Sequence, residues 1–422
     1  MSSRNAVGRH LASFAAASLA LSLPWPLLLV LAWDRYGDGP HGPLAVGLTA
    51  AARMLPYVLL SWVVGSLGDR IRRDRLLTAT LVLRSAFLCL LAVALLDEAL
   101  LLAVVAAALA VACGTPAYPT LAASMPGLAG SAKRRATEAL VTVEVAAWVV
   151  GPALGGLLLM PPTRPFIASV AVALTLLATV VAWRVPLPGP TTDRRTREAV
   201  SGMIRVVLRA PRVLAALAVG GMLNIVGSVT VVALLPLSHE VWHRGDAGFG
   251  VATAWFGFGA LAAPLFWWVR GSGRSRQRWG LAVLGLAVAG AALSPLPVLA
   301  LPVLGLAGAV SVLGESAVTE NIQDGVADEH RAGALGLGDA VMVSCAMAGS
   351  LAAPLLAAAL GARGALVLLG STCLVVVLPA VRRLRRTTAR QQRLAGSSGR
   401  SFAPLSGDTR PTLVESSRGR LR

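Results

Sequence analysis

The sequence predicts an all-α membrane protein that crosses the bilayer many times, and three observations lead to this fold class. Of the 422 residues, 56% are hydrophobic and only 14% are charged, whereas a soluble domain carries about 25% charged residues. The apolar residues fall in long runs, and a spanning helix needs about 20 of them. Lys and Arg gather in alternate connections between the runs. This composition excludes a soluble globular domain, a disordered chain and a collagen-like repeat.

Twelve apolar runs qualify as transmembrane helices, six on each side of a long polar connection. The first six are Leu11–Trp33, Leu44–Leu67, Leu76–Leu96, Ala99–Ala123, Glu138–Met160 and Pro165–Val185. The last six are Val213–Pro236, Gly248–Val269, Trp279–Ser294, Val298–Asn321, Gly333–Leu360 and Gly364–Arg382. The first run is too long for the apolar region of a signal peptide and leads straight into a second, so we expect it to be retained. The ninth run is short because Pro295 and Pro297 follow it.

The distribution of positive charge predicts the orientation of these helices. Of the 38 Lys and Arg residues, 32 lie in the N-terminus, the even-numbered connections and the C-terminal tail, and four lie on the opposite face. Because Lys and Arg concentrate on the cytoplasmic side, both termini are predicted to be cytoplasmic, in the plasma (inner) membrane. The net charge of +18 is thus a topology signal. We expect membrane lipids, and no nucleic acid, among the partners.

The long connection also predicts how the chain is divided. Gly151-Pro152 in the fifth run corresponds to Ala353-Pro354 in the eleventh, which agrees with two pseudo-repeated six-helix bundles. The predicted parts are an N-terminal bundle at 1–185, a cytoplasmic linker with an amphipathic helix at 186–212, a C-terminal bundle at 213–384 and a disordered basic cytoplasmic tail at 385–422.

The connection after the second run contains a recognisable motif. Its matching residues are Gly65, Leu67, Asp69, Arg70 and Arg73. The segment resembles the G-x-L-x-D-R-x-G-R-R signature of the major facilitator superfamily, and departs from it where Arg72 replaces a glycine and Asp74 a basic residue. The resemblance implies a twelve-helix transporter fold and a gating motif of Gly65, Asp69, Arg70 and Arg73. The Asp69 carboxylate is expected to cap the eleventh helix, near Gly333, because helix N-termini carry unsatisfied N–H groups.

The fifth run contains a second motif, Gly151, Pro152, Gly155 and Gly156. It resembles the G-P-x-x-G-G motif of exporters and antiporters in the same superfamily. Pro152 removes a helix hydrogen bond and bends the helix, and small residues four apart let a neighbouring helix approach closely. A diffuse likeness to the enterobactin-exporter-like, drug-efflux branch accompanies it, at Gly114–Pro119 and Met203–Leu208. The resemblance implies export, with import or facilitated entry of a small nutrient as the alternative.

Ionisable residues inside the apolar runs are the remaining signal, because a charge at the bilayer centre costs about 2.5–3.5 kcal/mol on insertion scales and faces protein or water. The candidate coupling or substrate residues are Arg53, Arg84, Glu144, Glu315 and Asp339. Glu144 is the leading candidate for a proton carrier, with Arg84 expected to stabilise its ionised form. Structural pairing of each group is the alternative.

A rival function comes from His239, Glu240 and His243, which fit the H-E-x-x-H pattern of zinc metalloproteases. The sequence supplies only Asp246 as a nearby third ligand, and the string lies at the outer end of the seventh run. We therefore expect no metal site, no cofactor and no enzymatic activity. A G-x-x-x-x-G-K-[ST] phosphate loop is absent from the sequence, which argues against direct coupling to ATP. The prediction is a secondary transporter that exports a small-molecule substrate by alternating access, with the proton as coupling ion.

Overall fold

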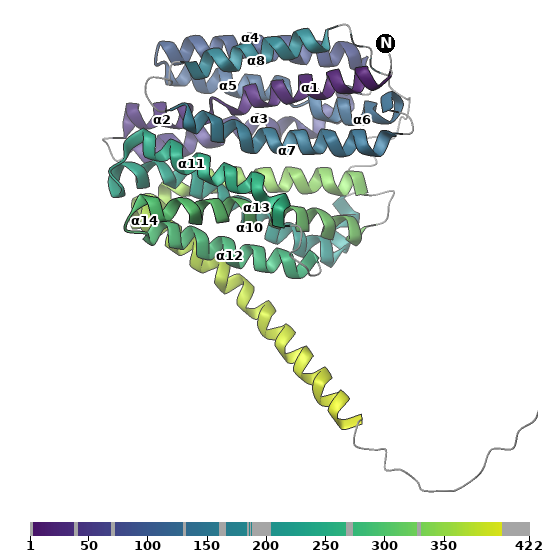
Figure 1. Ribbon diagram of the computed structural model, residues 1–422, viewed down its shortest axis with the longest axis vertical. Helices are drawn as coiled ribbons and strands as arrows, with labels where there is room; N and C mark the ends of the chain where they lie inside the picture. Colours follow the sequence, from purple (N-terminus) through teal and green to yellow (C-terminus); the bar gives the residue numbers. More distant parts are fainter. Residues whose placement is uncertain are drawn as a thin grey trace, which may run out of the picture. The chain divides into compact units, whose positions relative to one another are not determined.

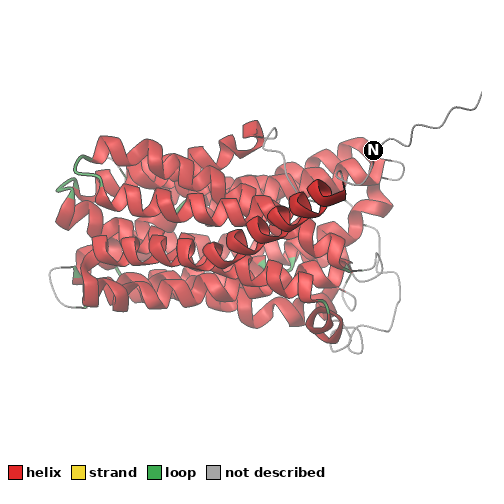
Figure 2. Ribbon diagram, turned by 90° about the horizontal axis from the view of Figure 1, so that it is seen from below, coloured by secondary structure: helices red, strands yellow, loops and turns green. Residues whose placement is uncertain are grey.

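A computed structural model describes residues 3–37, 41–68, 72–129, 132–159, 166–183, 185, 187, 204–266, 273–326 and 331–398. Within these ranges the chain forms helices joined by loops, with no strand (Figure 2). The first group of helices is α1 (Ser3–Ser22), α2 (Trp25–Tyr36), α3 (Gly42–Gly68), α4 (Arg73–Leu96), α5 (Leu100–Gly114), α6 (Ala117–Ala129), α7 (Lys133–Leu157) and α8 (Phe166–Ala182). The second group is α10 (Pro211–Pro236), η2 (Leu237–Val241), α11 (Gly245–Ala262), η3 (Ala263–Phe266), α12 (Gly273–Leu293), α13 (Pro297–Gly325) and α14 (Arg331–Ser398).

Each of the twelve predicted runs overlaps a helix, but two runs are interrupted. The first run divides into α1 and α2 at Leu23-Pro24, and the fourth divides into α5 and α6 at Thr115-Pro116. Proline explains both breaks, because it lacks the N–H that the preceding turn would use. The eleventh and twelfth runs both lie in α14, where Gly361 has a φ of 70° and separates two helical segments.

The helices are suited to a membrane by length and composition. Among the described residues, seven helical segments are long and apolar enough to cross a bilayer. Two further apolar helices, α8 and the segment Thr142–Leu157 of α7, are shorter. The all-helical membrane fold is therefore confirmed, and the number of twelve crossings stays a prediction.

Residues up to Val377 form one compact unit, and those from Leu378 form a second. In the first unit, the helices of the first group lie together and those of the second group lie together, with α7 packed against α11 where the groups meet (Figure 1). In the second unit, α14 continues to Ser398, so residues 385–398 are helical where the sequence predicts a disordered tail. The boundaries between the two bundles, the linker and the tail stay a prediction.

Side-chain bonds to backbone carbonyls hold the first group together. The Ser13 hydroxyl donates to the carbonyl of Ala178 at 2.7 Å, and the Arg9 Nε donates to that of Val181 at 3.0 Å, joining α1 to α8. The core beneath them is apolar and includes Phe14 and Leu140. These bonds matter in a membrane because lipid supplies no alternative partner for a polar group.

The linker is described only in part. Residues 204–209 form a short helix in which Ile204 and Leu208 are exposed and Val207 is buried. The amphipathic helix of the linker stays a prediction, and its first residues lie outside the described ranges.

Candidate functional site

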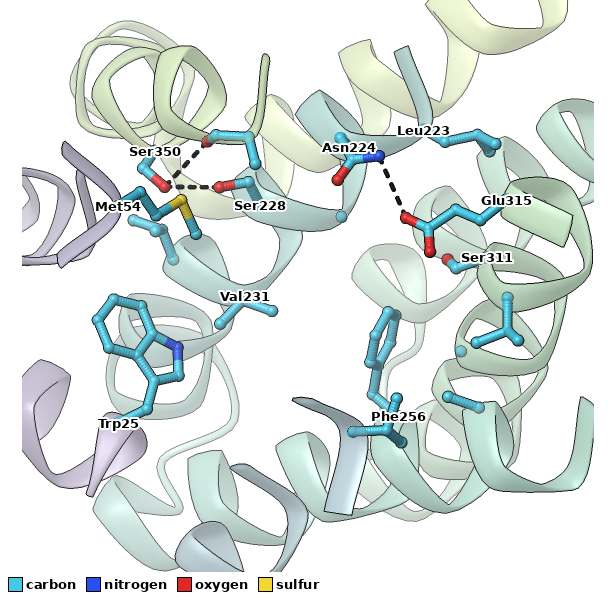
Figure 3. A pocket seen from close by; sticks show the side chains of 17 residues that line it. Trp25, Met54, Leu223, Asn224, Ser228, Val231, Phe256, Ser311, Glu315 and Ser350 are labelled. Carbon is cyan, nitrogen blue, oxygen red and sulfur yellow. Dashed lines mark hydrogen bonds between the residues drawn. The ribbon is translucent and has the colours of Figure 1, made fainter. Parts of the chain in front are cut away.

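A cavity of about 250 Å³ lies between the two groups of helices (Figure 3). Its lining comes from α2, α3 and α7 of the first group and from α10, α11, α13 and α14 of the second. Most of the lining is apolar, with Trp25 and Phe256 as its aromatic side chains. Because both groups contribute, a relative movement of the groups would change the cavity.

A carboxylate supplies the charge of this cavity. Among the described residues of the lining, Glu315 on α13 is the only ionisable side chain. The amide of Asn224 on α10 donates to Glu315 Oε1 at 3.1 Å, and the same amide donates to the carbonyl of Gly220. On another part of the wall, the hydroxyls of Ser228 and Ser350 lie 2.5 Å apart (Figure 3). The cavity therefore combines apolar walls with a few fixed polar groups, as small-molecule sites do.

Three of the predicted carboxylates form one cluster. The hydroxyl of Tyr57 on α3 donates to Asp339 Oδ2 on α14, a hydrogen bond that joins the two groups of helices. Asp339 also lies close enough to Glu144 on α7 and to Glu315 for the like charges of these carboxylates to repel one another. Asp339 and Glu315 are both exposed. The structure thus brings together Glu144, Glu315 and Asp339, which the sequence could place only at a common depth.

Arg53 on α3 lies behind the cavity wall and is 5% exposed. Its guanidinium carbon is 4.6 Å from the ring centroid of Trp25 and 5.1 Å from that of Trp148. Guanidinium groups bind well to such aromatic faces. The Nη2 atom of Arg53 is buried without a hydrogen-bond partner.

Arg84 on α4 occupies a different place. It is 3% exposed and lies against Gly114 and Cys113 of α5, where a side chain on Gly114 would overlap the guanidinium. The structure records no ion pair between Arg84 and Glu144, two residues that both lie in its described part. The expected stabilisation of Glu144 by Arg84 is therefore not seen, and the charged group that acts on Glu144 is the Asp339 carboxylate, which repels its ionised form.

The structure describes the first and last residues of the gating motif but not those between residues 68 and 72. Gly65 lies in the last turn of α3 and Arg73 is buried at the start of α4, whereas Asp69 and Arg70 lie outside the described residues. At the two departures from the motif, Arg72 and Asp74 form an ion pair of 2.9 Å. Arg72 has a φ of −55°, so its backbone does not need the glycine that it replaces.

The helix-five motif is a close-packing surface on α7. A side chain on Gly151 would overlap Ser22, and one on Gly155 would overlap the carbonyl oxygen of Leu23, so both face the break between α1 and α2. Gly156 faces the backbone of Gly250 on α11. Pro152 lies inside α7 between these contacts. The motif therefore packs α7 against the first helix of its own group and against α11 of the other group.

The geometry contradicts the metalloprotease alternative. Leu237–Val241 is a π-helical turn, and His243 lies beyond it with a φ of 52°, so the two histidines lack the α-helical spacing of a zinc pair. His239 instead bonds to Asp246 at 3.0 Å, and its ring lies 5.2 Å from that of Trp33 on α2. The string thus forms a contact between the two groups of helices.

Two residues of the site, Tyr57 and Asn224, are not predicted from the sequence. Tyr57 lies one helical turn from Arg53, on the same side of α3, and this spacing is the signal that could have found it. Asn224 is the only amide side chain in the seventh run, which is a usable signal because polar groups are rare in spans.

Comparisons with known proteins agree with this architecture. A sequence model described as Major Facilitator Superfamily matches residues 6–336. No curated protein sequence matches the chain. Among solved structures, a single-residue variant of the nucleoside transporter NupG aligns with a TM-score of 0.64 and 11% identity, over 89% of this chain and 98% of that one.

Two further structures are similar. The human organic anion transporter MFSD10 (TETRAN) aligns with a TM-score of 0.64 and 15% identity, over 89% of this chain and 99% of that one. A bacterial homolog of the human lysosomal transporter Spinster, inward-facing and unoccupied, aligns with a TM-score of 0.55 and 14% identity, over 85% of this chain and 81% of that one. At these identities the structures support the fold alone. The match of the family model over most of the sequence shows that the chain belongs to the Major Facilitator Superfamily and is a multi-pass membrane transporter rather than an enzyme.

Proposed function

We propose that this transporter is a secondary exporter, which moves a small organic molecule out of the cell by alternating access and is coupled to protons. The observation that carries the proposal is the cavity between the two groups of helices, with an accessible carboxylate, Glu315, in its wall. A site of this kind can face either side in turn if the two groups rock against one another.

The carboxylate cluster supports proton coupling. A proton carrier must bind its proton on one side and release it on the other, so its surroundings must change during transport. Asp339 meets this condition because its bond to Tyr57 joins the two groups and has to break when they separate there. Glu144 interacts with Asp339, so the same movement changes its surroundings.

Glu315 supports exchange of substrate for protons. Its carboxylate can hold a proton or a basic group of the substrate, but not both at once. Competition at one site is the simplest way to make the inward movement of a proton drive the outward movement of a substrate.

The direction rests on the helix-five motif, which resembles that of exporters, and import of a small nutrient is the alternative. The titles of two similar structures name nucleosides and organic anions as the cargo of those proteins, which supports a small organic solute as the class. The charge distribution of the sequence supports a plasma-membrane location with both termini cytoplasmic. The divisions at residues 185, 212 and 384 remain part of the proposal.

Flux through proteoliposomes tests the function. The purified chain is reconstituted, a panel of small organic compounds is loaded, and efflux is followed with and without an imposed pH gradient. We expect at least one compound to move against its own gradient when protons move the opposite way. Movement of the compound in the same direction as protons would indicate the import alternative, and absence of any protein-dependent flux would refute the function.

A further inference from the structure

Arg53 is a buried charged group that lacks a hydrogen-bond partner for part of its guanidinium. It is 5% exposed, contacts two tryptophan rings and leaves its Nη2 atom without a hydrogen-bond partner. No carboxylate pairs with it among the residues that the structure describes. Aromatic faces offset part of the cost of burying a guanidinium, but they accept only weak N–H···π bonds. An anionic group is the partner that would complete this site, because arginine forms charge-assisted bonds with carboxylate and phosphate.

The position of Arg53 links this incomplete site to the cavity. The Trp25 ring, on which the guanidinium stacks, belongs to the cavity wall, and so does the next residue, Met54. Trp148, the second aromatic contact, is 44% exposed and precedes Val149, another residue of the wall. Arg53 therefore lies directly behind Trp25 and outside the wall itself, so a bound molecule contacts its guanidinium only when the Trp25 side chain turns aside.

Glu315 determines what else that molecule must carry. Trp25 and Glu315 lie on opposite sides of the cavity (Figure 3). A purely anionic ligand at Arg53 would be repelled by the ionised carboxylate across the cavity, and a purely cationic one would leave Arg53 unpaired. A molecule with both charges satisfies both groups, and its apolar body fits between Trp25 and Phe256.

We propose that the substrate is an amphoteric organic molecule, whose anionic group binds Arg53 between Trp25 and Trp148 and whose basic group binds Glu315 across the cavity. This inference rests on the proposed function for its direction of transport. The binding geometry does not depend on that direction. In exchange transport, the proton competes only for the Glu315 end, while the Arg53 end supplies recognition.

Binding of three matched probes to the purified protein in lipid nanodiscs tests the inference without measuring transport. The first probe is an aminomethyl-naphthoic acid, which carries both charges. The second is a methylnaphthoic acid, which keeps the free carboxylate and lacks the amine. The third is a (methylnaphthyl)methylamine, which keeps the amine and lacks the carboxylate. We expect the doubly charged probe to bind about tenfold more tightly than either analogue, the factor that one additional charge-assisted bond supplies.

Two variants assign the charges to their ends of the site. Arg53→Gln should weaken binding of both probes that carry a carboxylate and should not weaken binding of the probe that carries only the amine. Glu315→Gln should weaken binding of both probes that carry an amine and should not weaken binding of the probe that carries only the carboxylate. Arg53→Lys should retain part of the preference, because it keeps the charge but not the planar fork. Arg35→Gln, at an exposed arginine in the last turn of α2, is the control and should leave all three affinities unchanged.

The outcomes separate this inference from the proposed function. Unchanged affinity for the carboxylate probes in a folded Arg53→Gln variant, or failure of the wild-type protein to bind any probe, would overturn the inference. Loss of proton-driven flux in proteoliposomes with the expected binding pattern intact would refute the proposed function and leave the amphoteric site standing.

Discussion

Arg53 and Arg84 show what can and cannot be predicted at the scale of a residue. The sequence identifies both as charges within apolar runs. Only the structure distinguishes the surroundings of these two arginines. Arg53 stacks on two aromatic rings beside the cavity, whereas Arg84 lies against Gly114 inside the first group of helices. The position of a residue within an apolar run indicates its depth in the membrane, because each helical residue rises by a fixed distance. The neighbours of that residue depend on packing between helices far apart in the chain.

Glu144 is the leading candidate for a proton carrier in addition to Glu315, and its neutralisation tests this role. Glu144→Gln keeps the size and hydrogen-bonding capacity of the side chain but removes its ability to carry a proton. We expect flux driven by a pH gradient to fall to background, with substrate binding and protein level unchanged. Glu98→Gln, at an exposed glutamate between α4 and α5, is the control. Unaltered pH-driven flux in Glu144→Gln would remove this residue from the mechanism.

Tyr57 is expected to hold the two groups of helices together in the conformation described here. Tyr57→Phe removes the hydroxyl that donates to Asp339, and a hydrogen bond to a charged group contributes about 1.5–3 kcal/mol. The variant should populate the opposite conformation more strongly. We expect this shift to change the rate at which a cysteine introduced at the cavity residue Ser228 is labelled, relative to the protein that keeps Tyr57. Tyr36→Phe, at an exposed position at the end of α2, should label as the wild type does. Identical labelling of the two variants would contradict the holding role.

At the scale of elements, periodicity and charge predict the helices well, but not where they break. The runs at α1–α2 and α5–α6 are continuous by hydropathy and divided in the structure at a proline, whereas α7 continues through Pro152. The close approach of α7 to α11 also follows from a readable feature, the glycines of the helix-five motif. The partner of that glycine face is not readable from sequence, since Gly250 lies in a helix of the other group.

The helix-five motif makes a prediction about close packing. Gly155→Leu inserts a side chain where the carbonyl oxygen of Leu23 lies, and overpacking costs about 1–3 kcal/mol. Pro152→Ala only restores a backbone donor. We expect Gly155→Leu to lower thermal stability and transport more severely than Pro152→Ala. Gly8→Leu is the control, because a Cβ at Gly8 meets no atom within 4 Å. Equal tolerance of the two motif substitutions would mean that the glycine face is not needed.

The gating motif makes a second prediction at this scale. Asp69 is expected to cap the eleventh helix in one conformation, and a charge at a helix N-terminus contributes about 0.3–1 kcal/mol. Asp69→Asn should therefore reduce transport while membrane insertion and folding persist, measured as flux and as monodisperse elution of the purified variant. Flux equal to that of the wild type would contradict the gating role.

At the scale of the whole molecule, the membrane class and the family follow from the sequence, and the site follows only in part. Composition requires a membrane, and the two motifs indicate the superfamily that the family model confirms. The cavity, by contrast, is built by seven helices from both groups, so no single stretch of sequence contains it. The proposed amphoteric site depends on Glu315 and on Trp25, which stacks on Arg53, lying on opposite sides of one cavity (Figure 3), and this placement is a property of the assembled fold.

The central claim is that the two groups of helices move against one another around this cavity, and distances between spin labels test it most directly. One label pair replaces the exposed residues Tyr36 and Leu296, at the end predicted to be extracellular, and the other replaces Arg72 and Asp324, at the opposite end. Both pairs are placed in a variant without native cysteines and measured in lipid nanodiscs by pulsed electron paramagnetic resonance. On acidification we expect one distance to increase as the other decreases. Distances that stay constant at both ends, in a protein that still transports, would contradict alternating access around this site.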